Sequence, residues 1–370
     1  MIDKRVIKFA RILVDHSAQI VAGDRVLLEG TTAAAPLIEA LYELIMERGG
    51  HPYPLMELPR QKEIFFQYAA EDQLAHTPIF KKLAYDEFES RIRIHSLTDT
   101  RSLSKVDPHK QVALGKTERP ILEAQMKRGA AKEFKWVTTL FPTQAYAEEA
   151  GMSLKDFEDF VFNAVHADDK TKHPVAYWQN IEKEQERKVE LFEGGDEVVL
   201  RGPNVELTLS IKGRKFVNAA GHHNMPDGEI YTSPVEESVS GWVRFTYPAI
   251  TQGRVVEGIQ LEFVEGRVVG AKAQKNEDFL LNMLETDQGA RYVGEFAIGT
   301  NFEIDRFTGN ILFDEKIGGS FHMALGAGYP ETGSKNASQI HWDMICDMRK
   351  DSQITVDDAV VYKDGEFVLG

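Results

Sequence analysis

The sequence contains a single cysteine, Cys346, among its 370 residues. One thiol excludes an intrachain disulfide framework, and it excludes zinc sites built from several cysteines. The residues around it include Met344, Ile345 and Met348. These neighbours favour a buried structural thiol over a nucleophile, because reactive thiols lie in exposed, electropositive surroundings.

Long apolar runs and an excess of basic residues are also missing. Charges interrupt the amino-terminal stretch MIDKRVIKFARILVDH throughout, so no signal peptide or membrane span is visible. We therefore expect no membrane partner, and the cytoplasm is the simplest compartment. The formal net charge is −15, which argues against a nucleic-acid partner because neutralising phosphates requires a basic face.

Several motifs that define enzyme classes do not occur. The chain has no HExxH, GxxxxGK[ST] or CxxC motif. The first turn between a predicted strand and helix reads EGTTAAAP and lacks the glycine fingerprint of a dinucleotide site. Residues 318–322 read GGSFH, which resembles a nucleophile elbow without its second glycine. A serine hydrolase is therefore disfavoured.

Two domains are expected from the length and from a change of pattern near residue 192. Residues 1–191 alternate short apolar strands with amphipathic helices, a rhythm that predicts an α/β domain with a mostly parallel open sheet. We interpret this half as a scaffold that frames the substrate cleft. Its expected helices are residues 5–22, 36–48, 71–85, 120–128, 153–167 and 174–191, and its expected strands are residues 26–30, 52–58, 91–97 and 134–142.

Residues 192–370 show period-two alternation, β-branched residues and glycine turns. This pattern predicts an α+β domain rich in antiparallel strands. The expected strands lie within residues 196–202, 205–213, 241–250, 254–266 and 267–274, and a helix is expected at residues 276–285.

Four islands in this second domain combine carboxylates and imidazoles with glycines, prolines and short apolar runs. They are residues 224–234, 294–301, 313–330 and 340–343. Carboxylates and neutral imidazoles together are the ligands of divalent transition-metal ions, and carboxylates can bridge two ions. The sequence therefore predicts that this domain carries a metal site.

Two glutamates stand out in the first two islands. Glu229 lies where a Pro-Asp-Gly turn meets a predicted strand, although an exposed acid is the commoner explanation of such a residue. Glu295 lies in VGEFAIG between apolar residues. A carboxylate embedded in such a strand must be paired, protonated or bound to a metal, because burying it alone is costly.

The last two islands contribute histidines and further acids. His322 lies among small and apolar residues, on one segment with Glu315 and Tyr329. A lone buried histidine is more often a core residue, but these neighbours favour a site. His341 and Asp343 form His-x-Asp, and in a strand this spacing places both side chains on one face. An ordinary histidine–carboxylate hydrogen bond is the alternative.

These islands carry a family resemblance. NMPDGEIYTSP, GEFAIGTN, the His-x-Ala-Leu-Gly of FHMALGAGY, and IHWD resemble the thermophilic-type metallo-aminopeptidases of peptidase family M29. The resemblance extends to the amino-terminal half and so covers nearly the whole chain. The loop between Glu315 and His322 departs from the family pattern because it is longer.

The resemblance implies two divalent ions, whether zinc, cobalt, manganese or magnesium. It further implies a homodimer and the release of amino acids from peptides with a free N-terminus. Tyr329 and Glu295 are implied to take part in catalysis. The implied metal ligands are Glu229, Glu295, Glu315, His322, His341 and Asp343. A divalent-metal hydrolase acting on another substrate, and a non-catalytic binding protein with the same fold, remain the alternatives.

Overall fold

The computed structural model describes residues 3–104 and 106–369, which form two compact units. The first unit comprises the chain up to Trp178 together with Gly221–Pro226. The second comprises Gln179–Ala220 and the chain from Asp227 onward. Each unit is described separately below.

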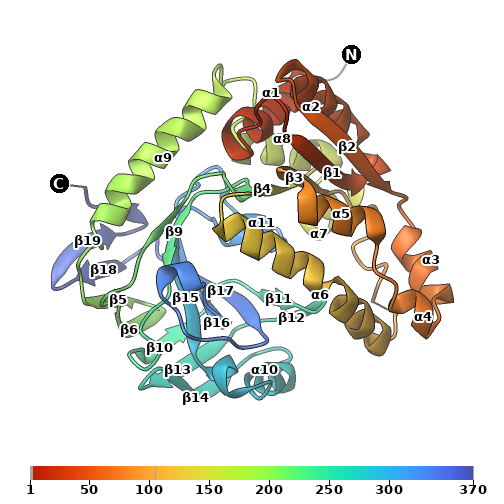
Figure 1. The fold of residues 1–370 in the computed structure, drawn as a ribbon. Helices are drawn as coiled ribbons and strands as arrows, with labels where there is room; N and C mark the ends of the chain where they lie inside the picture. Colours follow the sequence, from red (N-terminus) through yellow and green to blue (C-terminus); the bar gives the residue numbers. More distant parts are fainter. Residues whose placement is uncertain (1–2, 105, 370) are drawn as a thin grey trace. The chain divides into compact units, whose positions relative to one another are not determined.

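The first unit contains a five-stranded parallel sheet in the order β2-β1-β3-β4-β8, with helices packed around it (Figure 1). Its strands are β1 (Arg25–Thr31), β2 (His51–Glu57), β3 (Ser90–His95), β4 (Lys135–Leu140) and β8 (Asn224–Met225). Its helices are α1 (Lys4–Arg11), α2 (Ala35–Glu47), α3 (Gln61–Tyr68), α4 (Glu71–Leu74), α5 (Ile79–Glu87), α6 (Pro108–Ala130), α7 (Gln144–Glu149) and α8 (Leu154–Ala164). A π-helical turn, Ile12–Ser17, follows α1. The predicted open parallel sheet is confirmed.

Strand β2 lies at the edge of this sheet for a reason that is readable in its sequence. Pro52 and Pro54 have no amide hydrogen to donate to a second neighbour, and proline is therefore confined to edge strands. β2 pairs only with β1, and much of it is exposed.

Two helix predictions in the first unit need correction. The helix expected at residues 71–85 is two helices, α4 and α5, which are separated before Pro78 because the residue preceding a proline disfavours the helical conformation. The helix expected to begin at Pro120 begins at Pro108, where Asp107 caps it by accepting a hydrogen bond from the amide of His109. Helices α3 and α7 were not predicted.

The second unit contains two antiparallel sheets and a two-stranded ribbon (Figure 1). The larger sheet has the order β14-β13-β10-β6-β5-β18-β19-β20, the smaller has the order β17-β16-β15-β9-β7, and β11 pairs with β12. The strands are β5 (Glu197–Gly202), β6 (Val205–Ser210), β7 (Val217–Ala219), β9 (Glu229–Thr232), β10 (Ser240–Arg244), β11 (Ala249–Thr251), β12 (Arg254–Val256), β13 (Gln260–Val264), β14 (Arg267–Lys272), β15 (Val293–Gly299), β16 (Ser320–Gly326), β17 (His341–Asp347), β18 (Gln353–Val356), β19 (Ala359–Lys363) and β20 (Glu366–Phe367). Helices α10 (Glu277–Leu284) and α11 (Ile311–Asp314) belong to this unit, whereas α9 (Pro174–Glu190) begins in the first.

One hydrophobic core lies between the two sheets of the second unit. It joins side chains of the larger sheet, such as Leu200 and Leu261, to side chains of the smaller sheet, such as Phe296 and Met344. Cys346 belongs to this core, so the prediction of a buried thiol is confirmed. Because side chains alternate along a strand, the residues between these core positions lie on the opposite face of the smaller sheet.

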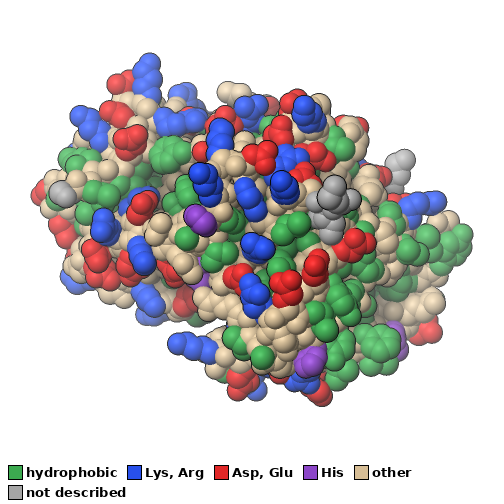
Figure 2. Space-filling view, turned by 90° about the horizontal axis from the view of Figure 1, so that it is seen from above, with side chains coloured by type: hydrophobic (Ala, Val, Ile, Leu, Met, Phe, Trp, Pro, Cys, Tyr) green, Lys and Arg blue, Asp and Glu red, His purple; other side chains and the backbone are tan. Residues whose placement is uncertain are grey.

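The surface carries its acidic excess mainly on the second unit. The first unit has 24 basic and 26 acidic residues, and the second has 19 and 32, so net charges of −2 and −13 result. Basic and acidic side chains are intermingled on the face shown in Figure 2. None of the described helices is long and apolar enough to cross a membrane.

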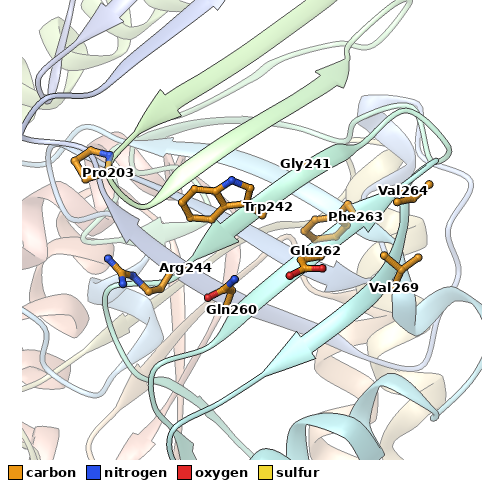
Figure 3. A pocket seen from close by; sticks show the side chains of 9 residues that line it. All are labelled: Pro203, Gly241, Trp242, Arg244, Gln260, Glu262, Phe263, Val264 and Val269. Carbon is orange, nitrogen blue, oxygen red and sulfur yellow. The ribbon is translucent and has the colours of Figure 1, made fainter.

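The outer face of the larger sheet is hollowed by an open groove of about 510 Å³. Trp242, Glu262, Gln260 and Arg244 lie along its floor (Figure 3). None of the predicted site residues lines this groove, and five of the six predicted ligands lie in the smaller sheet instead.

Candidate metal centre

Five of the six predicted ligands come from four strands of the smaller sheet. Glu229 begins β9, Glu295 lies in β15, His322 lies in β16, and His341 and Asp343 lie in β17. Their strand neighbours Ile230, Phe296, Phe321, Trp342 and Met344 point into the core. Alternation therefore places the five polar side chains together on the face away from the core. The prediction that His341 and Asp343 share a strand face is confirmed, and Trp342 points into the core on the other face.

Small residues lie opposite these side chains in the sheet register. Glu229 pairs with Gly299, and Glu295 pairs with Ala324. Asp343 also pairs with Ala324, His322 pairs with Ala297, and His341 pairs with Gly326. Cross-strand neighbours on one face lie about 5 Å apart, so bulky residues there would fill the space between the polar groups. Glycine and alanine leave that space open.

The carboxylates and imidazoles approach one another closely. His322 Nε2 lies 3.6 Å from Glu229 Oε2 and 3.5 Å from Glu295 Oε1. His341 Nε2 lies 3.3 Å from Glu295 Oε2 and 3.5 Å from Asp343 Oδ1. Glu295 therefore faces one histidine with each of its two oxygens.

All six predicted ligands fall into groups whose donor atoms lie within 4.8 Å of one another. One group is Glu229, Glu295 and His322; a second is Glu295, His341 and Asp343; a third is Glu315, His322 and Asp343. The sixth residue, Glu315, comes from the turn after α11 rather than from a strand.

Some of the atoms that could ligate a metal ion are buried and have no hydrogen-bond partner, as expected where an ion binds. Among the described residues, Glu229 Oε2 and Asp343 Oδ1 are buried and have no hydrogen-bond partner. Buried polar atoms are nearly always hydrogen-bonded, so two unpartnered oxygens in one cluster require an explanation. A divalent ion accepts lone pairs from carboxylate oxygens and imidazole nitrogens, and this donor set therefore fits one.

Hydrogen bonds outside the cluster fix the positions of two candidate ligands, Glu229 and His341. Gln185 of α9 is fully buried and donates from Nε2 to the carbonyl of Glu229 at 3.1 Å. The Nδ1 of His341 lies 2.8 Å from the carbonyl of Ala327. Because a carbonyl only accepts, the proton of His341 lies on Nδ1, which leaves Nε2 to face the cluster.

Lys316 contacts two of the candidate ligands, and sequence reasoning did not single it out. Its side chain is fully buried, and its ammonium contacts Glu229 Oε1 at 3.3 Å and also Glu315 Oε1. In the sequence, Lys316 is one of several basic residues in or near the four islands, and nothing marks it as buried. Its position directly after Glu315 was the only signal of a role at the site, since a buried carboxylate requires a compensating charge.

The pKa is raised for two acids of the cluster and lowered for the other two, depending on the charged groups beside them. Burial raises the pKa of Glu229 to about 8, although Lys316 opposes the rise. Burial also raises the pKa of Glu315. Burial alone would raise the pKa of Glu295 and Asp343 too, but the two imidazoles outweigh it at Glu295 and lower its pKa, and His341 brings the pKa of Asp343 to about 2.

The bases of the cluster are shifted toward their protonated forms. Burial lowers the pKa of His322 and His341, but the neighbouring carboxylates outweigh it and bring the values to about 9 and about 12. Burial likewise opposes the charge of Lys316, and the carboxylates of Glu229 and Glu315 still raise its pKa.

Tyr329 lies beside this cluster. Its ring centroid is 5.4 Å from that of His341 and 5.3 Å from that of Tyr231. The Tyr231 hydroxyl donates to Glu331 Oε1 at 2.7 Å. Burial and the carboxylates of the cluster, Glu295 foremost, raise the pKa of Tyr329. The phenol therefore keeps its proton at neutral pH and can donate a hydrogen bond.

The donor set fits a divalent metal ion, and comparison with known proteins gives the class of the protein. The sequence profile of the family described as "Thermophilic metalloprotease (M29)" matches residues 2–367. The chain therefore belongs to the thermophilic metalloprotease family M29, which makes it a hydrolase of the metallo-aminopeptidase class.

The chain is similar to several proteins named as aminopeptidases. It is 26% identical to Aminopeptidase 2 of Geobacillus stearothermophilus over 362 residues, which cover 91% of this chain and 86% of that protein. It is 26% identical to Aminopeptidase T of Thermus thermophilus, with 88% and 85% covered. It is 32% identical to Aminopeptidase AmpS of Bacillus subtilis over 209 residues, which cover 52% and 49%.

Two solved structures share the fold. Wild-type AmpT from Thermus thermophilus superposes with a TM-score of 0.85 at 21% identity and 99% coverage of both chains. The 2,5-dihydroxypyridine dioxygenase of Pseudomonas putida KT2440 superposes with a TM-score of 0.56 at 13% identity, with 99% of this chain and 97% of that chain covered. Because this architecture also occurs in a dioxygenase, function must be argued from the site rather than from the fold.

Proposed function

We propose that the protein is a two-metal aminopeptidase that releases N-terminal amino acids from peptides. The observation that carries this proposal is the position of Glu295 between two donor groups, one with His322 and Glu229 and one with His341 and Asp343. Because Glu295 faces a different imidazole with each oxygen, it would serve as a ligand common to both groups if each held an ion. The proposed ligands are Glu229, Glu295, Glu315, His322, His341 and Asp343.

When bound, a pair of divalent ions supplies a water of lowered pKa, polarises the scissile carbonyl and takes the free α-amine of the substrate. The oxygen and nitrogen donors suit zinc, cobalt, manganese and magnesium to different degrees. The acidic excess of the second unit favours the uptake of cations of any of these kinds.

The protein's own groups then act on the substrate. Tyr329, which keeps its proton, donates a hydrogen bond to the oxyanion of the tetrahedral intermediate and so stabilises the charge that develops there. Glu295 or Glu315 accepts the proton of the attacking water and passes it to the leaving amine.

A phosphoester hydrolase is disfavoured by the charges in the site. Such an enzyme needs cationic side chains that are free to hold the phosphoryl group. Lys316 is buried and already paired with Glu229 and Glu315. Its ammonium is therefore not available to clamp a phosphate.

We also propose that the protein is a cytoplasmic homodimer. The dimer follows from the resemblance to the M29 family, and Ile79 and Phe80 on α5, which are exposed by 66% and 78%, are candidates for the contact between subunits. Sedimentation velocity measures the mass in solution, and a monomer at micromolar concentration would contradict the dimer. Cell fractionation tests the compartment.

Elemental analysis of the purified protein, combined with hydrolysis of aminoacyl-p-nitroanilides, tests the activity. We expect about two metal equivalents and cleavage that a chelator abolishes and added metal restores. N-terminally acetylated analogues should not be cleaved, because they lack the free amine. Metal binding without cleavage would favour a binding role or another substrate, and no metal after reconstitution would exclude the two-metal site.

A further inference from the structure

Lys316 is a fully buried lysine inside a cluster of carboxylates. Its ammonium contacts Glu315, the preceding residue in the chain, and Glu229, which begins β9. An isolated buried ammonium is strongly unfavourable, and so is an isolated buried carboxylate. The contact between them offsets both costs.

The backbone around Lys316 fixes this position. The amide of Asn301 donates to the carbonyl of Lys316 at 3.2 Å, and the amide of Gly318 donates to the carbonyl of Asn301 at 3.0 Å. Gly299 lies so close that an added Cβ would come within 2.3 Å of the carbonyl oxygen of Ile317. Only glycine allows this approach, so the fold itself brings the lysine to the donors.

The contact divides the two oxygens of Glu229. Oε1 lies 3.3 Å from the ammonium, whereas Oε2 has no hydrogen-bond partner and lies 3.6 Å from His322 Nε2. The lysine thus contacts one oxygen of Glu229 and leaves the other oxygen facing His322. Its partners Glu229 and Glu315 belong to donor groups with His322, and neither belongs to the group of His341 and Asp343.

We propose that Lys316 is a positioning residue that serves as an internal counter-cation, keeping the carboxylates of the metal centre assembled when metal is absent. This inference rests on the proposed two-metal function. Four carboxylates, Glu229, Glu295, Glu315 and Asp343, share one cluster with only two imidazoles, so Lys316 adds a third positive charge that offsets their mutual repulsion. Bound divalent ions would neutralise them, so the ammonium matters most in the metal-free protein.

This role predicts that the loss of Lys316 destabilises the metal-free protein more than the metal-loaded protein. Removing one partner of a buried ion pair leaves an uncompensated charge and is strongly destabilising. Lys316→Met keeps most of the apolar volume and removes the charge. The substitution should therefore lower the melting temperature of the metal-free protein by about 5 °C or more. The melting temperature of the metal-loaded protein should fall much less. The difference in melting temperature between the metal-loaded and the metal-free protein should therefore increase.

Thermal unfolding of wild type, Lys316→Met and the exposed control Lys335→Met, each with and without bound metal, measures this difference. Equal losses in both states, or no loss in either, would overturn the inference, since packing alone gives equal losses. A wild type that binds no divalent ion would instead remove the proposed function. The two failures are therefore distinguishable.

A second variant keeps the test informative if Lys316→Met does not fold without metal. Adding Glu229→Gln removes one of the carboxylates that Lys316 contacts, so the double variant should regain stability in the metal-free state. Lys316→Arg, which retains the positive charge, should keep the wild-type difference. A double variant less stable than Lys316→Met would contradict the charge-pairing role.

Discussion

The Nδ1 of His341 donates a hydrogen bond of 2.8 Å to the main-chain carbonyl of Ala327. This bond fixes both the tautomer and the orientation of the ring, because a carbonyl cannot donate. The other nitrogen, Nε2, is thereby held toward Glu295 and Asp343. His322 has no such support, since its Nδ1 is buried without a partner among the described residues. The two imidazoles of the cluster are therefore held to different degrees.

Metal binding should release protons. The pKa of His322 is raised to about 9 and that of His341 to about 12, so both imidazoles are protonated in the metal-free protein at pH 7. A metal ligates only the unprotonated nitrogen. Metal affinity should therefore rise with pH across the neutral range. Calorimetric titration in buffers of different ionisation enthalpy measures the released protons, and a heat that does not depend on the buffer would contradict this expectation.

Glu295 should be required for both ions. It belongs to two donor groups, whereas Glu229 does not belong to the group of His341 and Asp343. We expect Glu295→Ala to lose both metal equivalents and all cleavage, and Glu229→Ala to retain the ion held by His341 and Asp343. Elemental analysis after dialysis measures this difference. Glu262→Gln, an exposed acid on the larger sheet, is the matched control, and equal metal loss in the two alanine variants would rule out a bridging carboxylate.

Tyr329 should affect the chemical step and leave the metal in place. Removing one hydrogen-bond donor from an oxyanion site costs about 100- to 1000-fold in kcat. We therefore expect Tyr329→Phe to lower kcat by about this factor, with KM and metal content close to those of the wild type. Steady-state kinetics with elemental analysis checks this. A rise in KM with unchanged kcat would assign Tyr329 to substrate binding only.

Asp314 should make stability depend on pH. Burial raises its pKa to about 7, although Thr308 donates two hydrogen bonds to its carboxylate. Its pKa in the unfolded chain is about 4. Between these values the unfolded state binds fewer protons than the folded state, so stability falls as pH rises from about 4 to 7. Asp314→Asn removes this titration, and its stability relative to wild type should increase over that range.

Melting temperatures of the metal-loaded proteins at pH 5 and pH 8 test this sign, because bound metal suppresses the titration of the neighbouring donors. The exposed variant Asp305→Asn serves as a control. A constant difference between Asp314→Asn and wild type at the two pH values would show that Asp314 does not titrate in this range.

The local features of the fold could be predicted from the sequence. Alternation along a single strand is enough to place His341 and Asp343 on one face and Trp342 on the other. Burial of Glu295 and His322 followed from their apolar neighbours. The alternation of short apolar strands with amphipathic helices indicated a parallel sheet. Each of these inferences depends on contacts between residues that are close in the chain.

The remaining features depend on contacts between residues that are far apart. The contact of Lys316 with Glu229 joins positions 87 residues apart, and nothing at either position identifies the other. The division of the second unit into two sheets also depends on pairings such as β5 with β18. The start of α6 was missed because Pro120 gave a start signal of the same kind as Asp107 and Pro108.

The short strand β8 completes the parallel sheet of the first unit, with the amide of Thr138 donating to the carbonyl of His223 and with Met225 fully buried. Its residues follow Gln179–Ala220, which belong to the second unit. During synthesis, when domains fold in order from the amino terminus, the first sheet must therefore wait for its last strand. The ribosome has to synthesise 42 residues of the other unit (179 to 220) before it reaches residues 221–226. Neither unit can be released intact by a single cut in the chain.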